Sequence, residues 1–180
     1  MRKTKFKIQE LCMIGLFTAI IVIMAQIAIP MPFGVPITMQ TFAVMIAGIV
    51  LGSKNGALST LIYMLLGAIG LPVFSNFTGG WQVLVGPTSG FIVTFPLMAY
   101  IIGLGTECRT CHKWTYPIGL ILGNILNFLG GISIFCLLTQ SPFVVGFMTC
   151  VLPFIPVTVL KTILASILGL DIKRRLQALL

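Results

Sequence analysis

Acidic side chains are almost absent from this chain of 180 residues. Aspartate and glutamate together number 3, there is 1 histidine, and charged residues of both signs make up 8%. The acids Glu10, Glu107 and Asp171 lie at the edges of apolar segments rather than inside them. General acid–base and metal-assisted catalysis need paired carboxylates, histidines or an activated nucleophile. We therefore expect that the protein is not an enzyme.

Signatures of nucleotide, metal and cofactor binding are also missing. No G-x-x-x-x-G-K-[ST] occurs, so the chain has no P-loop of its own. Cys108-x-x-Cys111-His112 matches a c-type haem attachment pattern. Such haems are attached outside the cytoplasm, whereas the charge pattern below puts this loop inside, and a zinc site would need a fourth ligand. We expect no metal and no cofactor. The remaining cysteines lie within predicted spans and form no disulfide framework: Cys12, Cys136 and Cys150.

What the chain has in abundance is apolar sequence, since 58% of its residues are hydrophobic. Soluble domains carry about 25% charged residues, roughly three times the share found here. A transmembrane helix takes about 20 residues, so the length accommodates five to seven spans. We expect residues 1–180 to form a single transmembrane domain.

The placement of basic residues predicts the topology. Ten of the 11 lysines and arginines lie before the first apolar segment, in the second or fourth loop, or near the C-terminus. Six spans put all ten on one side, which the positive-inside rule makes cytoplasmic. We expect an all-α integral membrane protein of the cell membrane with six transmembrane helices and both termini cytoplasmic. The net charge of +8 then reflects topology and contact with the lipid bilayer, not nucleic-acid binding.

The expected spans are separated by turn and breaker residues. A turn at residues 52–56 on the inside follows the short second span, and Pro153 and Pro156 interrupt the last apolar segment. Broken helices near the middle of the membrane often mark transport sites. The six spans are predicted at residues 10–29, 37–51, 57–69, 91–104, 116–138 and 143–170.

Residues 71–90 are the least helix-like part of the chain, because prolines, glycines and polar residues interrupt them throughout. Irregular backbone at membrane depth is tolerated only where it is buried in protein or lines a cavity. We expect a lid or wall on the outer side. The alternative is an ordinary interfacial loop with Trp81 in the aromatic belt.

Polar and small residues within the spans have two interpretations each. Asn124 and Asn127 share a helix face and favour interhelical hydrogen bonds, with ligand contact as the alternative. Gly15 and Ala19 form a small-xxx-small pair, which serves either packing within this chain or docking of a partner.

Lys161 is the one basic residue well inside a span. A charge near the bilayer centre costs roughly 2.5–3.5 kcal/mol, so such residues usually face a cavity and have a function. By the predicted topology the outer loops carry no charge, and an anion entering from outside meets its first cation at Lys161. We expect a binding site for a small anionic molecule. A channel is the alternative, but a Gly/Pro-rich cap over one lysine suits binding better.

Four separate blocks, in order, resemble the BioY family, the biotin-specific substrate-capture (S) components of energy-coupling factor transporters. The resemblance covers about residues 15–168. It implies a six-helix fold, a cavity capped by the first, third and fifth loops, and docking of a transmembrane coupling subunit on Gly15 and Ala19, with two cytoplasmic ATPases as further partners. The blocks are residues 35–52, 63–74, 86–91 and 153–161.

The resemblance also supplies a ligand and a site. Biotin has an anionic valerate and a ureido group with one acceptor and two donors, and either end suits Lys161. The family usually has an acidic residue three before this lysine, where the chain has Thr158. This departure leaves another small vitamin-like anion as the alternative substrate. The expected binding residues are Lys161, Thr158, Asn76, Gln40, Phe74, Trp81, Tyr63 and Thr88.

Overall fold

The computed structural model describes residues 8–31, 35–108 and 114–179, with side chains up to residue 176. Within these residues the chain is almost entirely helical, which confirms the all-α prediction. The helices are α1 (Ile8–Gln26), α2 (Gln40–Ala68), the 3₁₀ helix η1 (Ser75–Phe77), α3 (Trp81–Leu84), α4 (Ser89–Glu107), α5 (Thr115–Thr139), α6 (Phe143–Cys150) and α7 (Ile155–Leu179).

Five of these helices are long and apolar enough to cross a membrane: α1, α2, α4, α5 and α7. Most bounds agree with the predicted spans within a few residues. The first helix ends early, at Gln26, because residues 28–29 form the strand β1 (Ala28–Ile29), which pairs antiparallel with β2 (Ile37–Thr38). The last helix continues beyond residue 170, where an Arg175–Asp171 ion pair of 2.9 Å spans one turn.

The helix α2 is a folded hairpin rather than one rod. Gly52 has φ 82° and ψ −173°, which lies outside the helical region. Gln40 and Tyr63 would stand about 35 Å apart along a straight helix, yet Gln40 Nε2 donates to the Tyr63 hydroxyl at 2.5 Å. The predicted turn at residues 52–56 is therefore confirmed. It divides α2 into a first leg (residues 40–51) and a second leg (residues 53–68).

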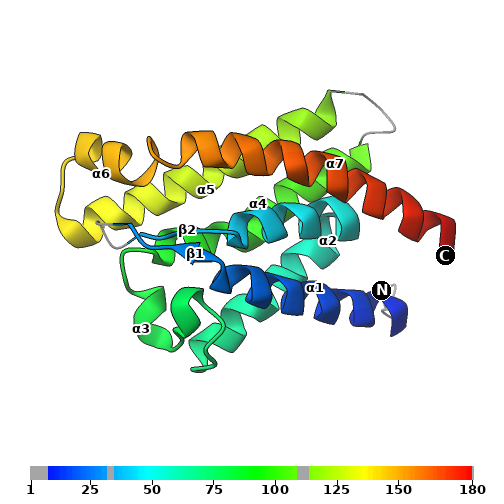
Figure 1. Cartoon of the computed structure of the whole chain (residues 1–180), viewed down its shortest axis with the longest axis horizontal. Helices are drawn as coiled ribbons and strands as arrows, with labels where there is room; N and C mark the ends of the chain where they lie inside the picture. Colours follow the sequence, from blue (N-terminus) through cyan, green and yellow to red (C-terminus); the bar gives the residue numbers. More distant parts are fainter. Residues whose placement is uncertain (1–7, 32–34, 109–113, 180) are drawn as a thin grey trace, which may run out of the picture.

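The connections gather at two ends of the molecule (Figure 1). The start of α1, the turn between the legs of α2, the end of α4 and the end of α7 lie at one end. The strands β1 and β2, the segment around α3 and the α5–α6 connection lie towards the other end. This alternation is what the predicted topology requires. The count of six crossings and the cytoplasmic placement of the termini stay predictions.

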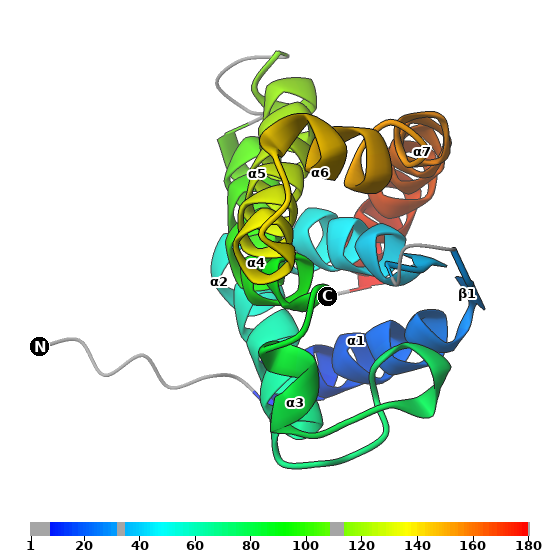
Figure 2. The same cartoon turned by 90° about the vertical axis from the view of Figure 1, so that its left-hand side faces the viewer.

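The first leg of α2 forms the centre of the structure. Figure 2, viewed from the end that carries β1 and α3, shows it surrounded by α1, α4, α5, α6 and α7. Val44, Met45 and Ala47 are fully buried. Small residues bring the helices close, since a Cβ added at Gly48 would lie 2.7 Å from the Ala99 oxygen of α4.

The predicted interruption of the last apolar segment is also confirmed. The helix α6 ends at Cys150 and α7 begins at Ile155, with turns between them. Pro153 lies in this break, and Pro156 lies in the first turn of α7, where proline removes no intrahelical hydrogen bond. The break places α7 with Lys161 near its start and facing the first leg of α2.

Candidate functional site

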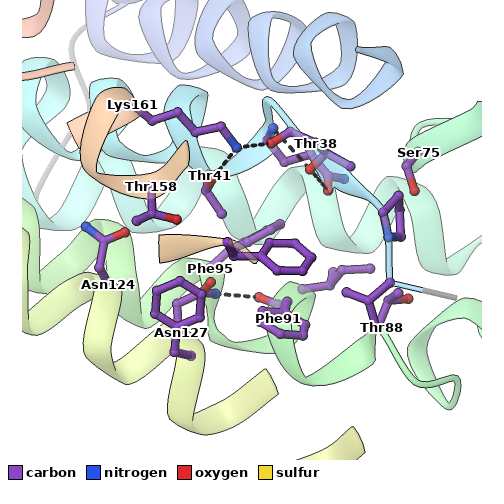
Figure 3. Close-up of a pocket in the computed structure, with 16 residues that line it drawn as sticks. Thr38, Thr41, Ser75, Thr88, Phe91, Phe95, Asn124, Asn127, Thr158 and Lys161 are labelled. Atoms are coloured by element: carbon purple, nitrogen blue, oxygen red, sulfur yellow. Dashed lines mark hydrogen bonds between the residues drawn. The ribbon is translucent and has the colours of Figure 1, made fainter. Parts of the chain in front are cut away.

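A cavity opens where the first leg of α2, the β2 strand and the helices α4, α5 and α7 converge (Figure 3). The volume of the cavity is about 50 Å³. This is several times the roughly 10–15 Å³ that one water molecule needs on the same measure. Its lining combines one cation with amide, hydroxyl and aromatic side chains. The lining residues are Val35, Pro36, Thr38, Gln40, Thr41, Ser75, Thr88, Phe91, Ile92, Phe95, Asn124, Asn127, Phe128, Phe154, Thr158 and Lys161.

Lys161 is the only charged residue that the described part of the chain contributes to this lining, and the residue is 4% exposed. Its Nζ donates to the Thr38 carbonyl oxygen at 2.5 Å and lies 3.5 Å from the Thr41 hydroxyl (Figure 3). No carboxylate of the described residues pairs with this ammonium group. A buried charge without a counter-charge is costly, and the prediction that this cavity binds a small anion stays a prediction.

A chain of hydrogen bonds fixes the side chain of Gln40 at the start of α2. The Thr38 hydroxyl donates to Gln40 Oε1 at 2.8 Å, and Gln40 Nε2 donates to the Tyr63 hydroxyl. The Tyr63 ring in turn meets the Phe74 ring edge to face, with centroids 5.6 Å apart and an interplanar angle of 84°. Gln40 therefore presents a defined amide orientation to the cavity, and the second leg of α2 supports it from behind.

The segment that follows α2 is held to α1 by one glutamine. Gln26 Nε2 donates to the Phe74 oxygen at 3.2 Å, and Gln26 Oε1 accepts from the Phe77 amide at 2.9 Å. Asn76 and Phe77 both have positive φ, 56° and 55°. These hydrogen bonds hold the bend at η1, whose first residue, Ser75, is part of the cavity lining. The segment thus supplies a cavity wall, as its irregular sequence predicts.

The two asparagines of α5 both join helices and line the cavity. Asn127 Nδ2 donates to the Phe91 oxygen at 2.9 Å and to the Thr94 hydroxyl at 2.8 Å, both on α4. Asn124 Nδ2 donates to the Leu120 oxygen at 2.8 Å. Asn124 Nδ2 also lies 3.4 Å from the Thr162 hydroxyl of α7, so interhelical hydrogen bonding is confirmed for both asparagines. Because both residues also face the cavity, ligand contact remains open alongside it.

The eight predicted binding residues fall into three groups. Lys161, Thr158, Gln40 and Thr88 line the cavity. Tyr63 and Phe74 are fully buried behind it. Trp81, which is 67% exposed, and the exposed Asn76 lie outside the lining. The ligand-binding roles themselves stay predictions for all eight.

Sequence reasoning missed several lining residues. Thr41, Phe91, Phe95 and Phe154 were not assigned to the site, although all four contribute to the cavity wall. Phe91 and Phe95 lie one helical turn apart on α4, and this spacing is the one signal that could have indicated a shared face. Aromatic residues at such spacing are common in every apolar helix, so the signal has little specificity.

Gly15 and Ala19 lie on the exposed face of α1. The opposite face of that helix is buried, including Ile14, Phe17 and Ile21, and a Cβ added at Gly15 would meet nothing within 4 Å. None of the described residues packs closely on Gly15, which favours the docking alternative over packing within this chain. Docking of a partner stays a prediction.

No group of three metal-ligating side chains occurs in the part of the chain that the structure describes. Cys108 is exposed at the end of α4. The other two members of the Cys108-x-x-Cys111-His112 pattern lie outside the described residues. Among the described residues, neither cysteine nor histidine lines the cavity.

Comparison with known proteins identifies the family. The sequence matches the BioY family over residues 1–178. It is 39% identical over 168 residues to the biotin transporter BioY of Thermotoga maritima, covering 92% of this chain and 96% of that protein. It is 40% identical over 163 residues to the "probable biotin transporter BioY" of Pyrococcus horikoshii, covering 91% and 95%.

A solved structure shares the fold. The crystal structure of "the S-component for biotin from an ECF-type ABC transporter" superposes with a TM-score of 0.83 at 28% identity, covering 94% of this chain and 92% of that one. The relatives are transport proteins, which agrees with the prediction that the chain is not an enzyme. The arrangement of helices around a lysine-containing cavity is thus that of a multi-pass membrane transport protein, and the chain belongs to the BioY family.

Proposed function

We propose that this protein is the membrane-embedded biotin-binding subunit of a prokaryotic biotin uptake system. The observation that supports this proposal most strongly is the environment of Lys161. It is a buried cation without a counter-charge from the described residues, in a cavity with amide and aromatic walls. Biotin suits this lining because its carboxylate needs a cation, its ureido group needs amide partners and its bicyclic ring needs apolar contact. Named biotin transporters among the relatives support this choice of ligand.

Energy for uphill transport comes, in this proposal, from other subunits. The sequence has no P-loop, and the similar S component belongs to an ECF-type ABC transporter. We propose a transmembrane coupling subunit and two cytoplasmic ATPases as partners. The exposed small residues Gly15 and Ala19 provide a face of α1 where a partner helix could approach closely.

Calorimetric titration of the purified chain with biotin tests the proposed ligand. We expect saturable binding of one biotin per chain and a rise in the midpoint of thermal unfolding with biotin concentration, because a ligand that binds only the folded state stabilises it. Absence of both effects would reject biotin. Parallel titrations with other anionic vitamins would then identify a different substrate of the same class.

Docking on α1 has its own test. Gly15→Leu and Ala19→Leu place bulk where a partner helix would pack, and Ser133→Leu, on the exposed face of α5, is the matched control. We expect the two α1 variants to lose co-purification with a co-expressed coupling module while the isolated chains still bind biotin. Equal co-purification of all three variants would place the docking face elsewhere.

A further inference from the structure

Gln26, the last residue of α1, joins that helix to the chain between α2 and α3, which we call the wall segment (residues 69–80). Its Nε2 donates to the Phe74 oxygen at 3.2 Å, and its Oε1 accepts from the Phe77 amide at 2.9 Å. Nε2 also lies 3.2 Å from the Val22 oxygen, one turn earlier on α1, which fixes the direction of the side chain. Both the donor and the acceptor of one side-chain amide are thus used on the same stretch of backbone.

The backbone that Gln26 contacts has an unfavourable conformation. Asn76 and Phe77 have φ of 56° and 55°, a region that residues other than glycine rarely adopt. Such a conformation persists only where surrounding contacts hold it. The Phe77 side chain is 71% exposed, so its own packing contributes little. The two hydrogen bonds of Gln26 reach the backbone on both sides of Asn76, and they therefore hold this bend in place.

The other side of the wall segment faces the cavity. Ser75 is part of the cavity lining. Phe74 is fully buried, and its ring meets Tyr63, whose hydroxyl accepts the hydrogen bond that orients Gln40. Gln26 itself is not a lining residue. A displacement of the wall segment would therefore change the cavity at two places, although Gln26 does not touch it.

We propose that Gln26 is a positioning residue for biotin binding, which holds the wall segment against α1 and thereby slows dissociation of the ligand. A ligand that leaves the cavity needs a local displacement of the walls around it. The free energy of such a displacement rises with the number of hydrogen bonds that must break. This inference rests on the proposed function, because it assumes biotin as the ligand. It assigns a kinetic role to a residue that makes no contact with the cavity.

The first test measures the dissociation of radiolabelled biotin, chased with unlabelled biotin, from the wild type, Gln26→Met and Gln82→Met. Methionine is similar to glutamine in length but does not replace the amide hydrogen bonds. Gln82 is exposed and its Nε2 lies 3.4 Å from the Gly79 oxygen, so it contacts the wall segment without joining it to α1. We expect Gln26→Met to raise the dissociation rate constant about tenfold and to change the association rate constant by less than about twofold. Gln82→Met should match the wild type.

The second test, Gln26→Glu, isolates the donor. Glutamate keeps an oxygen that can accept from the Phe77 amide, but an ionised carboxylate cannot donate to the Phe74 oxygen. At about pH 5 a carboxyl group held against carbonyl oxygens is protonated and can donate again. We expect this variant to release biotin about tenfold faster than the wild type at about pH 8 and at nearly the wild-type rate at about pH 5. None of the residues whose backbone Gln26 contacts has a titratable side chain: Val22, Val73, Phe74 and Phe77.

The outcomes separate the inference from the function on which it rests. Unchanged dissociation from Gln26→Met would overturn the inference and leave the biotin assignment in place. Equal acceleration by Gln82→Met would also overturn it, and so would fast dissociation from Gln26→Glu at both pH values. If the wild type binds no biotin, the proposed function fails instead. The comparison of Gln26→Glu at two pH values decides even if Gln26→Met does not fold, because both measurements use the same protein.

Discussion

The two legs of α2 begin in different ways. The second leg starts beside a protein carboxylate: Glu107 Oε1 accepts from the Ser53 amide at 2.7 Å, and the Ser53 hydroxyl lies 2.9 Å from Oε2. The first leg starts at Gln40 with an uncapped N-terminus and has the Lys161 ammonium beside it instead of an acid. The second leg of α2 thus has a protein carboxylate at its N-terminus, and the first leg has none among the described residues.

This difference separates stability from binding. A carboxylate at a helix N-terminus is favourable because it accepts hydrogen bonds from free backbone amides and interacts with the helix dipole. At Ser53 that stabilisation is present in the folded chain at all times. At Gln40 no protein carboxylate of the described residues takes that place, and in the proposed function this start lies beside the ligand. Changes at the Ser53 start should therefore alter stability, and changes at the Gln40 start should alter affinity.

The largest expected effect on this comparison comes from Gly52→Ala. A Cβ at Gly52 would lie 2.4 Å from Glu107 Oε1, and φ of 82° is strained for alanine. The exposed Glu107 side chain can move aside, so we expect a loss of about 1–3 kcal/mol of stability from backbone strain, seen as a lower midpoint of thermal unfolding in detergent. Gly15→Ala is the control, because its added Cβ meets nothing within 4 Å. Equal midpoints for the two variants would contradict the strained backbone at Gly52.

Thr158→Asp should place an acidic side chain near the start of the first leg of α2, which has none. An aspartate one turn before Lys161 supplies an internal counter-charge and repels a ligand carboxylate. We expect biotin affinity to fall about tenfold, or about 1.4 kcal/mol. Thr158→Asn, which is neutral, controls for size. If the aspartate variant binds biotin more tightly than wild type does, the ureido group rather than the carboxylate meets this end.

Glu107→Gln removes the built-in anion but keeps the side-chain shape. Glu107 is exposed, so we expect a stability loss of no more than about 1 kcal/mol. Biotin affinity should be unchanged, because the cavity lining does not include this residue. Asp171→Asn, which breaks the exposed ion pair with Arg175, is the matched control and should cost less. A fall in biotin affinity for Glu107→Gln alone would mean that the two starts of α2 are coupled.

The smallest expected effect is that of Tyr63→Phe. The Tyr63 hydroxyl accepts the hydrogen bond that orients Gln40 at the start of the first leg of α2. A neutral hydrogen bond contributes about 0.5–1.5 kcal/mol net, so losing it should weaken biotin about threefold. Tyr100→Phe, at a tyrosine that is 40% exposed, is the control and should bind as the wild type does. Unchanged affinity in both variants would show that Gln40 needs no support from the second leg.

Features that depend on local chemistry were predicted well from the sequence. The glycine turn at residues 52–56 and the proline break before α7 both occur, because backbone preferences at Gly and Pro act locally. The lysine was identified because a charge inside an apolar segment needs a polar environment. Its position in the cavity follows from that requirement.

Features that depend on side-chain direction were not predictable in the same way. The residue types of Asn76 and Trp81 suit a ligand, but the backbone of their segment turns both away from the cavity lining. The two-residue strands β1 and β2 are too short to show any periodicity. The uncapped start of α2 needed the structure, since no sequence pattern tells which helix amides meet water, a side chain or a cavity.

The central claim is that the cavity lined by Lys161 binds biotin. A crystal structure of the chain with biotin bound tests it most directly. We predict biotin in this cavity, with one of its oxygen atoms within hydrogen-bonding distance of Lys161 Nζ, about 2.7–2.9 Å. Biotin bound elsewhere on the chain, with this cavity empty, would contradict the account.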